Sequence, residues 1–227
     1  MTAQIMGDGV FPEAEAVRDV QQWPALQCDV LLPHLARFVG SSIAGKSVYN
    51  LEPMYDGARS LTPKRGYLDA LRTASKVLDY QARNVEFLRA HGVDAEHLPY
   101  RYIPQVRRME TQKRWDVLFI GSYSPRRHSI LREMRAGGLS VLHIDGAYGS
   151  DLDEPIAKAR VVVNIHFDDI PLPLEVVRLN RLIAYGWHGI KIISERGWDE
   201  SENAEYETYV RFTDDIVRAC LQTKVKS

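Results

Sequence analysis

The sequence predicts an α/β fold made of two domains, each built around a parallel sheet. Short apolar runs alternate with helical patterns along most of the 227 residues, as expected of parallel strands covered by helices on both faces. Pro99 and Pro104 mark the approach to a charged, glutamine-rich stretch at residues 105–114, which has the composition of a linker. We therefore expect Rossmann-like domains at residues 1–107 and 108–227 that face each other across a cleft.

The strand-to-helix turn at residues 116–127 is the most informative local pattern. Residues 117–120 form an apolar run suited to a buried strand, and Gly121 permits a tight exit from it. Ser124 is suited to cap the following helix, and Pro125 to occupy its first position. The free N–H groups at such a helix start, together with the helix dipole, favour a phosphate group there.

Two arginines follow this cap. Arg126 and Arg127 are able to add charge-assisted hydrogen bonds to a phosphate. The alternative is an ordinary strand-to-helix turn with two solvated arginines.

The other elements continue the same alternation. In the second half, strands are expected at residues 140–144, 161–167, 190–194 and 209–212, and helices at residues 152–159, at residues 174–185 and from about residue 214. In the first half, strands are expected at residues 29–33, 47–50, 76–78 and 97–100, and helices at residues 13–22, 67–73 and 83–91.

Composition narrows the functional classes. The net charge of −1 excludes the global basic field that dominates nucleic-acid affinity, although not a local patch. Cys28 and Cys220 are the only cysteines, which suits a reducing compartment. No apolar run approaches the roughly 20 residues that span a bilayer, and the start of the chain lacks the order of a signal peptide. We therefore expect a cytoplasmic protein without a transmembrane segment.

Six short motifs carry a resemblance to a known family. In order, they are Tyr-Asn-Leu-Glu-Pro-Met at 49–54, Val-Leu-Asp-Tyr-Gln-Ala-Arg-Asn at 77–84, Asp-Val-Leu-Phe-Ile-Gly at 116–121, Val-Val-Val-Asn-Ile-His at 161–166, Glu-Val-Val-Arg at 175–178 and Ile-Ile-Ser-Glu at 192–195. Together they resemble small bacterial and phage glycosyltransferases of the GT-B type, close to the CgeB-like group of glycosyltransferase family 1. The similarity extends from about residue 45 onward.

The resemblance implies a metal-independent transferase that uses a nucleotide sugar linked to UDP, GDP or dTDP and needs no further cofactor. It implies that the second domain holds this donor and that the first holds the acceptor, which is a carbohydrate, a lipid-linked glycan or a modified nucleobase. It leaves the oligomeric state open. Family members commonly have a fuller first domain with an opening strand and a glycine-rich turn. Residues 1–28 supply only Gly7, Gly9 and the expected helix, so we expect a reduced first domain.

The candidate donor-binding residues share a position at strand ends or helix starts of the second domain, where ligands of open parallel sheets bind. They are Gly121, Ser122, Tyr123, Arg126, Arg127, Asn164, Glu175, Arg178 and Glu195. Glu175 is suited to hydrogen bonds with sugar hydroxyls, as the family implies, or simply to the dipole at its helix start. Arg178 is suited to a phosphate, or to an i,i+3 ion pair with Glu175.

The candidate catalytic residues are Glu52, Asp79 and His166. Glu52 and Asp79 each follow a predicted strand of the first domain, where a general base for an acceptor hydroxyl is expected. Asp79 is alternatively a cap for the next helix, and His166 is alternatively structural. We take Glu52 as the base and Arg126 as the partner of the diphosphate.

Two metal or phosphate patterns are weaker. Asp151 and Asp153 match an Asp-X-Asp metal motif, but Ser150 or Asp151 more simply caps a helix, with Glu154 completing a capping box. The histidines and cysteines show no metal-ligand spacing.

Residues 40–47 have the spacing of a phosphate-binding loop, which would have to follow a strand and open a helix.

Taken together, these patterns leave three competing functions: a sugar transferase, a sugar-nucleotide-binding module or subunit without activity, and a P-loop nucleotide hydrolase.

Overall fold

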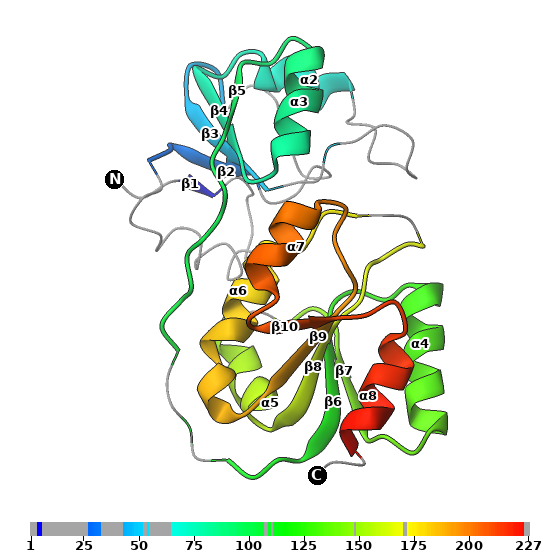
Figure 1. Cartoon of the computed structure of the whole chain (residues 1–227). Helices are drawn as coiled ribbons and strands as arrows, with labels where there is room; N and C mark the ends of the chain where they lie inside the picture. The colour runs from blue at the N-terminus through cyan, green and yellow to red at the C-terminus, as the bar shows by residue number, and fades with distance from the viewer. Residues whose placement is uncertain are drawn as a thin grey trace. The chain divides into compact units, whose positions relative to one another are not determined.

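The chain forms two compact units, Met1–Tyr102 and Ile103–Ser227, in a computed structural model (Figure 1). The structure describes residues 4–5, 27–32, 43–51, 54, 65–106, 109, 111–147, 149–169 and 172–224. The sequence places the boundary five residues later, between 107 and 108. Each unit contains a five-stranded sheet in which every described strand pair is parallel. The predicted α/β class with parallel sheets is therefore confirmed.

The sheet of the first unit follows chain order. Its strands are β1 (Gln4–Ile5), β2 (Val30–Leu32), β3 (Ser47–Asn50), β4 (Lys76–Asp79) and β5 (Ala95–His97), and its described helices are α2 (Arg65–Leu71) and α3 (Ala82–Ala90). The expected lack of an opening strand is wrong, because β1 pairs with β2. The helix expected at 13–22 lies outside the described residues.

The strand expected at residues 97–100 is also wrong, because β5 lies two residues earlier. Ala95 is the fully buried member of β5 and pairs with Val77 of β4. The backbone N–H of Leu98 donates to Asp79 O, and Pro99 has no N–H with which to continue a ladder.

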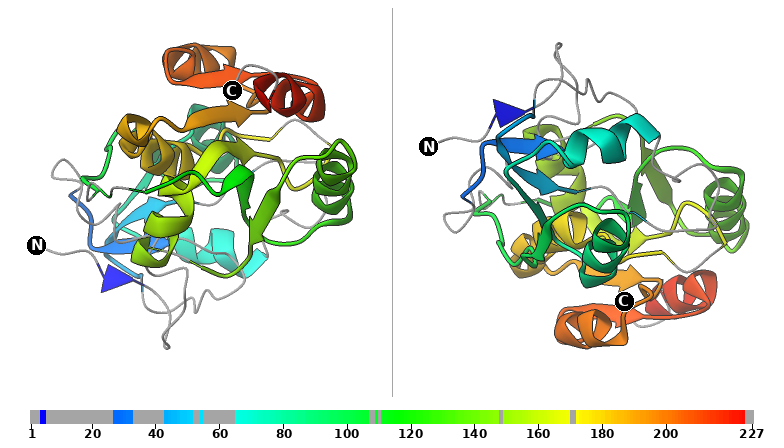
Figure 2. Two further views of the ribbon diagram at one scale, coloured as in Figure 1. Left: turned by 90° about the horizontal axis from the view of Figure 1, so that it is seen from below. Right: turned by 90° about the horizontal axis from the view of Figure 1, so that it is seen from above.

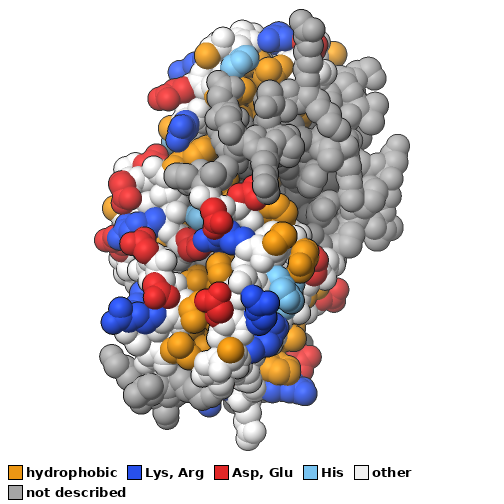
Figure 3. Space-filling view, turned by 90° about the vertical axis from the view of Figure 1, so that its right-hand side faces the viewer, with side chains coloured by type: hydrophobic (Ala, Val, Ile, Leu, Met, Phe, Trp, Pro, Cys, Tyr) orange, Lys and Arg blue, Asp and Glu red, His pale blue; other side chains and the backbone are white. Residues whose placement is uncertain are grey.

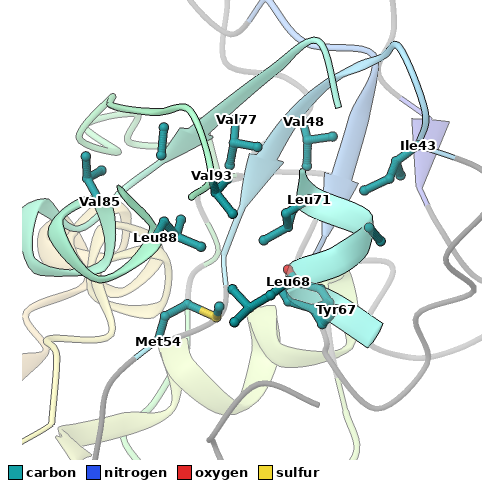
Figure 4. Close-up of a cluster of buried hydrophobic side chains, with 12 residues drawn as sticks. Ile43, Val48, Met54, Tyr67, Leu68, Leu71, Val77, Val85, Leu88 and Val93 are labelled. Atoms are coloured by element: carbon teal, nitrogen blue, oxygen red, sulfur yellow. The ribbon is translucent and has the colours of Figure 1, made fainter. Parts of the chain in front are cut away.

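An apolar core holds α2 and α3 against β3 and β4 (Figure 4). Val48 and Val77 project from the strands, and Leu71 and Leu88 come from the two helices; all four are almost wholly buried. Val48 and Val77 are paired across β3 and β4, and because successive side chains of a strand point to opposite faces, both lie on the face that the helices cover.

Ser47 decides the outcome for the phosphate-loop pattern. It is the first residue of β3, and its backbone N–H and hydroxyl both donate to the Asp29 carboxylate at 2.8 Å. A phosphate-binding loop would open a helix at this point. The described part of the pattern, residues 43–47, therefore gives the hydrolase interpretation no support.

The second unit is a doubly wound sheet with strand order β10-β9-β8-β6-β7. Its strands are β6 (Trp115–Ile120), β7 (Val141–Ile144), β8 (Ala159–Asn164), β9 (Lys191–Ser194) and β10 (Val210–Phe212). Its helices are α4 (Pro125–Ala136), η3 (Gly149–Leu152), α5 (Asp153–Ala157), α6 (Val176–Ala184), η4 (Gly186–His188), α7 (Glu200–Tyr206) and α8 (Ile216–Lys224). Figure 2 shows α4 and α8 on one side of this sheet and α5 and α6 on the other.

Two helices of the second unit differ from expectation. The sequence missed α7, which begins after Asp199, whose carboxylate accepts hydrogen bonds from the backbone N–H groups of Ser201 and Glu202. The predicted capping box before α5 is wrong: Leu152 occupies the cap position, with no side-chain hydrogen bond. The Asp153 carboxylate instead accepts hydrogen bonds from Arg181 of α6 and from Tyr185, the residue that follows α6.

Within the described residues, no helix is both long and apolar enough to cross a membrane. On the face shown in Figure 3, acidic and basic side chains are interspersed, in keeping with the net charge of −1.

Candidate functional site

The strand order of the second unit locates the place where a ligand is expected. Counted from β6, it reads 2-1-3-4-5, so the chain leaves β6 and β8 toward opposite sides of the sheet. Ligands of doubly wound sheets bind beyond the carboxyl ends of the two strands at such a switch point. Gly121 follows β6, and Asn164 ends β8. Both predicted donor residues therefore lie at this position.

Gly121 lets three side chains approach the backbone closely. Its φ of +153° is unfavourable for other residues. A Cβ atom there would lie 3.1 Å from the Phe119 ring, 3.4 Å from Nη1 of Arg127 and 3.6 Å from Nη2 of Arg178. Two guanidinium groups therefore lie close to Gly121.

Ser124 begins α4 as predicted. Its Oγ accepts a hydrogen bond from the backbone N–H of Arg127 at 3.2 Å and donates one to Phe167 O at 3.0 Å. In the described part of the chain, the backbone N–H groups of Ser122 and Ser124 have no hydrogen-bond partner. They remain available at the positive end of the helix dipole.

Arg127 is buried, with only 4% of its surface exposed. Its Nε and Nη2 donate to Ile165 O at 3.0 and 2.7 Å, and its Nη1 donates to Ser122 O at 3.1 Å. Burial and the nearby Arg178 charge lower the pKa of Arg127 to about 10, so the group stays charged at neutral pH. These bonds also explain why β8 ends before residue 165 and not at 167, because the Ile165 carbonyl is directed to a side chain.

Arg126 is held by two carboxylates. It makes a two-pronged contact with Glu195 and a third contact with Asp169, and its Nη1 also donates to His166 O at 3.1 Å. Fork-to-carboxylate pairing of this kind fixes the guanidinium plane. The arginine chosen from the sequence for the diphosphate is therefore already engaged.

Glu175 is the acidic centre of the site. Its Oε2 accepts a hydrogen bond from Asn164 Nδ2 at 2.8 Å, and its Oε1 lies 3.6 Å from Arg178 Nη1. Burial raises the pKa of this carboxyl, but His166, Arg178 and Asn164 outweigh burial and lower the pKa to about 2. The side chain remains 27% exposed, so an ionised carboxylate faces solvent here.

Asn164 and Arg178 complete the chain of contacts. Arg178 Nη1 donates to Asn164 Oδ1 at 2.7 Å, and Asn164 Nδ2 donates also to Ser194 Oγ at 3.0 Å. Arg178 is 28% exposed at its side chain. Its Nη2, beside Gly121, has no partner in the described residues.

His166 lies against the same carboxylate. Its Nε2 is 2.8 Å from Arg196 O, and its Nδ1 is 3.5 Å from Glu175 Oε2. Burial lowers the pKa of His166, but the Glu175 carboxylate outweighs burial, and the net shift is upward. Because Nε2 needs its hydrogen for the carbonyl, Nδ1 carries one only when the ring is cationic. The ring is nearly buried.

Ser122 and Tyr123 form the exposed edge of this site. The Tyr123 ring is 56% exposed, and its backbone N–H donates to Asp145 Oδ2 at 3.3 Å. Eight of the nine predicted donor residues therefore contact at least one other member of the set. The ninth, Tyr123, is next to Ser122 in the sequence.

The predicted catalytic residues of the first unit have different surroundings. Glu52 lies outside the described residues. Asp79 is fully buried at the end of β4, where its carboxylate accepts hydrogen bonds from Asn50 Nδ2 at 2.6 Å, Gln81 N at 2.8 Å and Asn84 Nδ2 at 3.0 Å. It does not cap α3, which has Gln81 at its cap position. Tyr67 extends the network by donating to Asn50 Oδ1 at 2.6 Å.

Sequence reasoning missed four polar members of these clusters: Asn50, Asn84, Asp169 and Ser194. Ser194 and Asn50 end strands that were predicted, so their positions at the carboxyl edge were a usable signal. Asn84 and Asp169 gave no comparable local signal, because their partners are distant in the sequence. Among the described residues, no three His, Cys, Asp or Glu side chains gather as metal ligands.

Sequence comparison finds relatives in a giant virus of amoebae. No family model matches the chain. It is 33% identical over 137 residues to the uncharacterized protein L138 of Acanthamoeba polyphaga mimivirus, covering 56% of this chain and 15% of L138. It is 28% identical over 169 residues to the uncharacterized protein L140 of the same virus, covering 69% of this chain and 54% of L140. The chain therefore spans at most about half the length of these relatives.

Structural comparison finds distant neighbours, of which one example follows. A crystal structure of AviGT4, a glycosyltransferase involved in avilamycin A biosynthesis, aligns with a TM-score of 0.39 and 14% sequence identity, covering 79% of this chain and 75% of that chain.

Proposed function

We propose that this chain is a nucleotide-sugar-dependent glycosyltransferase whose second unit binds the donor diphosphate beyond β6 and β8. The observation that carries the proposal is the convergence of the guanidinium groups of Arg127 and Arg178 on Gly121, next to the start of α4. A diphosphate needs cationic and N–H donors that converge on one side. The motif resemblance supplies the reaction class.

Arg178 takes the role that the sequence gave to Arg126. Arg126 is bound to Glu195 and Asp169, and releasing it would separate a partly buried ion pair. The Nη2 group of Arg178 lies close to Gly121, and the Arg178 side chain is 28% exposed. Arg178 Nη2 can therefore donate to a phosphate without first breaking an existing hydrogen bond of its own.

Glu175 is proposed to accept hydrogen bonds from hydroxyls of the ribose or sugar. Its low pKa keeps it an acceptor at any physiological pH, which suits hydroxyl donors. Its negative charge also limits where a phosphate can sit, so we expect the diphosphate on the Gly121 side of Arg178 and the hydroxyls on the Glu175 side.

Calorimetric titration with UDP, GDP, dTDP and their common sugar forms tests donor binding. We expect one nucleotide to bind and Arg178→Met to weaken it by about tenfold or more, the usual scale for a charge-assisted hydrogen bond. Arg132→Met is the matched control, because Arg132 is an exposed arginine on α4 away from the strand ends. If no nucleotide binds, or if both variants weaken binding equally, the proposed site is wrong.

Turnover is tested separately from binding. Glu52 remains our proposed base, and Glu52→Gln should lower turnover by roughly 100-fold while leaving donor affinity unchanged. Sugar release from the bound donor, followed with and without a chelator, measures both activity and the proposed independence from metal. Tight donor binding without any transfer would instead support a binding module.

A further inference from the structure

A second pocket lies at the opposite edge of the second sheet, where the strands begin. It has a volume of about 190 Å³ and is lined by Lys113, Asp116, Arg160, Val161, Gly189, Lys191 and Thr223. Apart from Thr223 of α8, these residues lie just before or within the first residues of β6, β8 and β9, whereas the site described above lies beyond the ends of the same strands. The pocket has room for a phosphate-sized ion and several waters.

The charges that line this pocket are unbalanced. Three of its side chains are cationic, and Asp116 is the only carboxylate among them. Asp116 is also committed elsewhere, because its Oδ2 accepts hydrogen bonds from the backbone N–H and hydroxyl of Ser140 at 2.8 and 2.9 Å. Its other oxygen is 3.9 Å from Arg160 Nε, which is a long contact for an ion pair. In the described part of the chain, Lys113 and Lys191 have no carboxylate partner at all.

Lys113 is fixed in place by the backbone. Its Nζ donates to Ala157 O at 3.0 Å, and Thr111 Oγ1 donates to the same oxygen at 3.1 Å. Burial, together with the nearby Arg160 charge, lowers the pKa of Lys113. Cations held together without counter-charges repel one another, and a bound anion would remove that cost.

We propose that this pocket is a binding site for a phosphate group, either inorganic phosphate or a phosphate monoester, with Lys113 and Arg160 as its principal ligands and Lys191 as the third cation. Lysine presents a point charge and arginine a fork of donors, and both suit phosphate oxygens. The proposal does not depend on the transferase function, because it uses none of the residues at the other edge.

Titration of the isotope-labelled full chain with inorganic phosphate, followed by amide NMR shifts, tests the site. We expect saturable shifts at residues 113–116, 160–161 and 189–191, and no such shifts with chloride at matched ionic strength. Lys113→Met and Arg160→Gln should each weaken binding about tenfold, and Arg132→Gln should leave it unchanged. Equal binding in all three variants, or an absence of saturation, would overturn the proposal.

A gain of affinity guards against variants that weaken binding only by misfolding. Asp116→Asn removes the one negative charge of the pocket while its remaining oxygen still accepts from Ser140, so phosphate should bind several-fold more tightly. Unchanged or weaker binding in this variant would count against the site. Competition identifies the ligand: glycerol phosphate should shift the same residues and be displaced by inorganic phosphate. An ester that phosphate fails to displace would contradict recognition of the phosphate group.

Discussion

Two carboxylates lie at the carboxyl ends of strands in the two units, yet their surroundings are opposite. Asp79 ends β4 in the first unit and accepts hydrogen bonds only from amide groups, those of Asn50, Gln81 and Asn84. Burial raises its pKa to about 7, and these bonds offset burial only in part. Glu175 stands beyond β8 in the second unit, among cations, and its pKa falls to about 2.

The difference separates a structural network from a site. Neutral donors satisfy the Asp79 oxygens without supplying charge, so the group has no spare capacity for a ligand and resists ionisation. The cations around Glu175 keep it ionised, and one of them, Arg178, retains a free face. A perturbed pKa therefore marks a functional candidate here only when its cause is a nearby charge and the group is still accessible.

Asp79→Asn should have the largest effect on this contrast, because it removes the part of the pH dependence of stability that Asp79 gives the first unit. The folded-state pKa, about 7, lies above the unfolded value. The stabilising contribution is therefore fully present below pH 3.8 and is lost as pH rises through about 7. The loss is on the order of 4 kcal/mol at about 1.4 kcal/mol per pH unit. Carboxyl ¹³C NMR of Asp79 measures the titration, and amide exchange in β3 and β4 measures the stability. An Asp79 titration midpoint near pH 4 would contradict the prediction, because it would show that the amide donors fully offset the effect of burial on the pKa.

Arg127→Met should destabilise the second unit by about 3 kcal/mol, since it leaves the carbonyls of Ile165 and Ser122 without their buried donor. Urea unfolding followed by tryptophan fluorescence reports it, because Trp115, Trp187 and Trp198 lie in that unit. The exposed Arg132→Met serves as the control and should change stability by less than about 0.5 kcal/mol. Equal stability of the two variants would mean that the Arg127 bonds are offset by the cost of burying its charge.

Glu175→Gln should cost about 2 kcal/mol at pH 7 and nothing near pH 2. The folded pKa of Glu175 is below the unfolded value, so its contribution is present above pH 4.5 and is lost as pH falls toward 2. The pH dependence thus has the opposite sign to that of Asp79. Unfolding of wild type and variant at pH 7 and pH 3 measures the difference, and a gap that widens in acid would refute the assignment.

Ser124→Ala should have the smallest effect, a loss of about 1 kcal/mol from the removed helix cap. The loss should be independent of pH between 4 and 8, because the serine carries no charge. Ser129→Ala, on the exposed side of the same helix, is the control. A loss that depends on pH would tie the cap to the charges around Glu175.

The local features of the second unit could be predicted from the sequence. The strand before Gly121, the Ser124 cap and Pro125 at the first helical position depend on neighbours within a few residues. The helix α7 was missed because its sequence Glu-Ser-Glu-Asn-Ala-Glu-Tyr has little apolar periodicity, although Asp199 followed by Glu202 is a local capping signal for its start.

The partners within the site were beyond sequence reasoning. Arg126 and Glu195 are separated by 69 residues, and no spacing rule joins them, so both were assigned singly to a ligand. The same limit explains why the helix cap predicted at Ser150 or Asp151 is wrong. The neighbouring Asp153 is hydrogen-bonded to Arg181, 28 residues away, and this long-range contact could not be read from the local capping pattern. The sequence thus predicted where residues lie in the sheet better than it predicted which side chains they contact.

Hydrogen bonds join the start of α4 to the backbone at residues 165–167. Arg127, Arg126 and Ser124 each donate to a successive carbonyl of that segment. Residues 165–167 are therefore held in place in the folded protein, and under the proposed function a ligand that reaches them would not lose affinity by having to order them. The rate of association at this edge should then follow diffusion and charge and not the rearrangement of a loop.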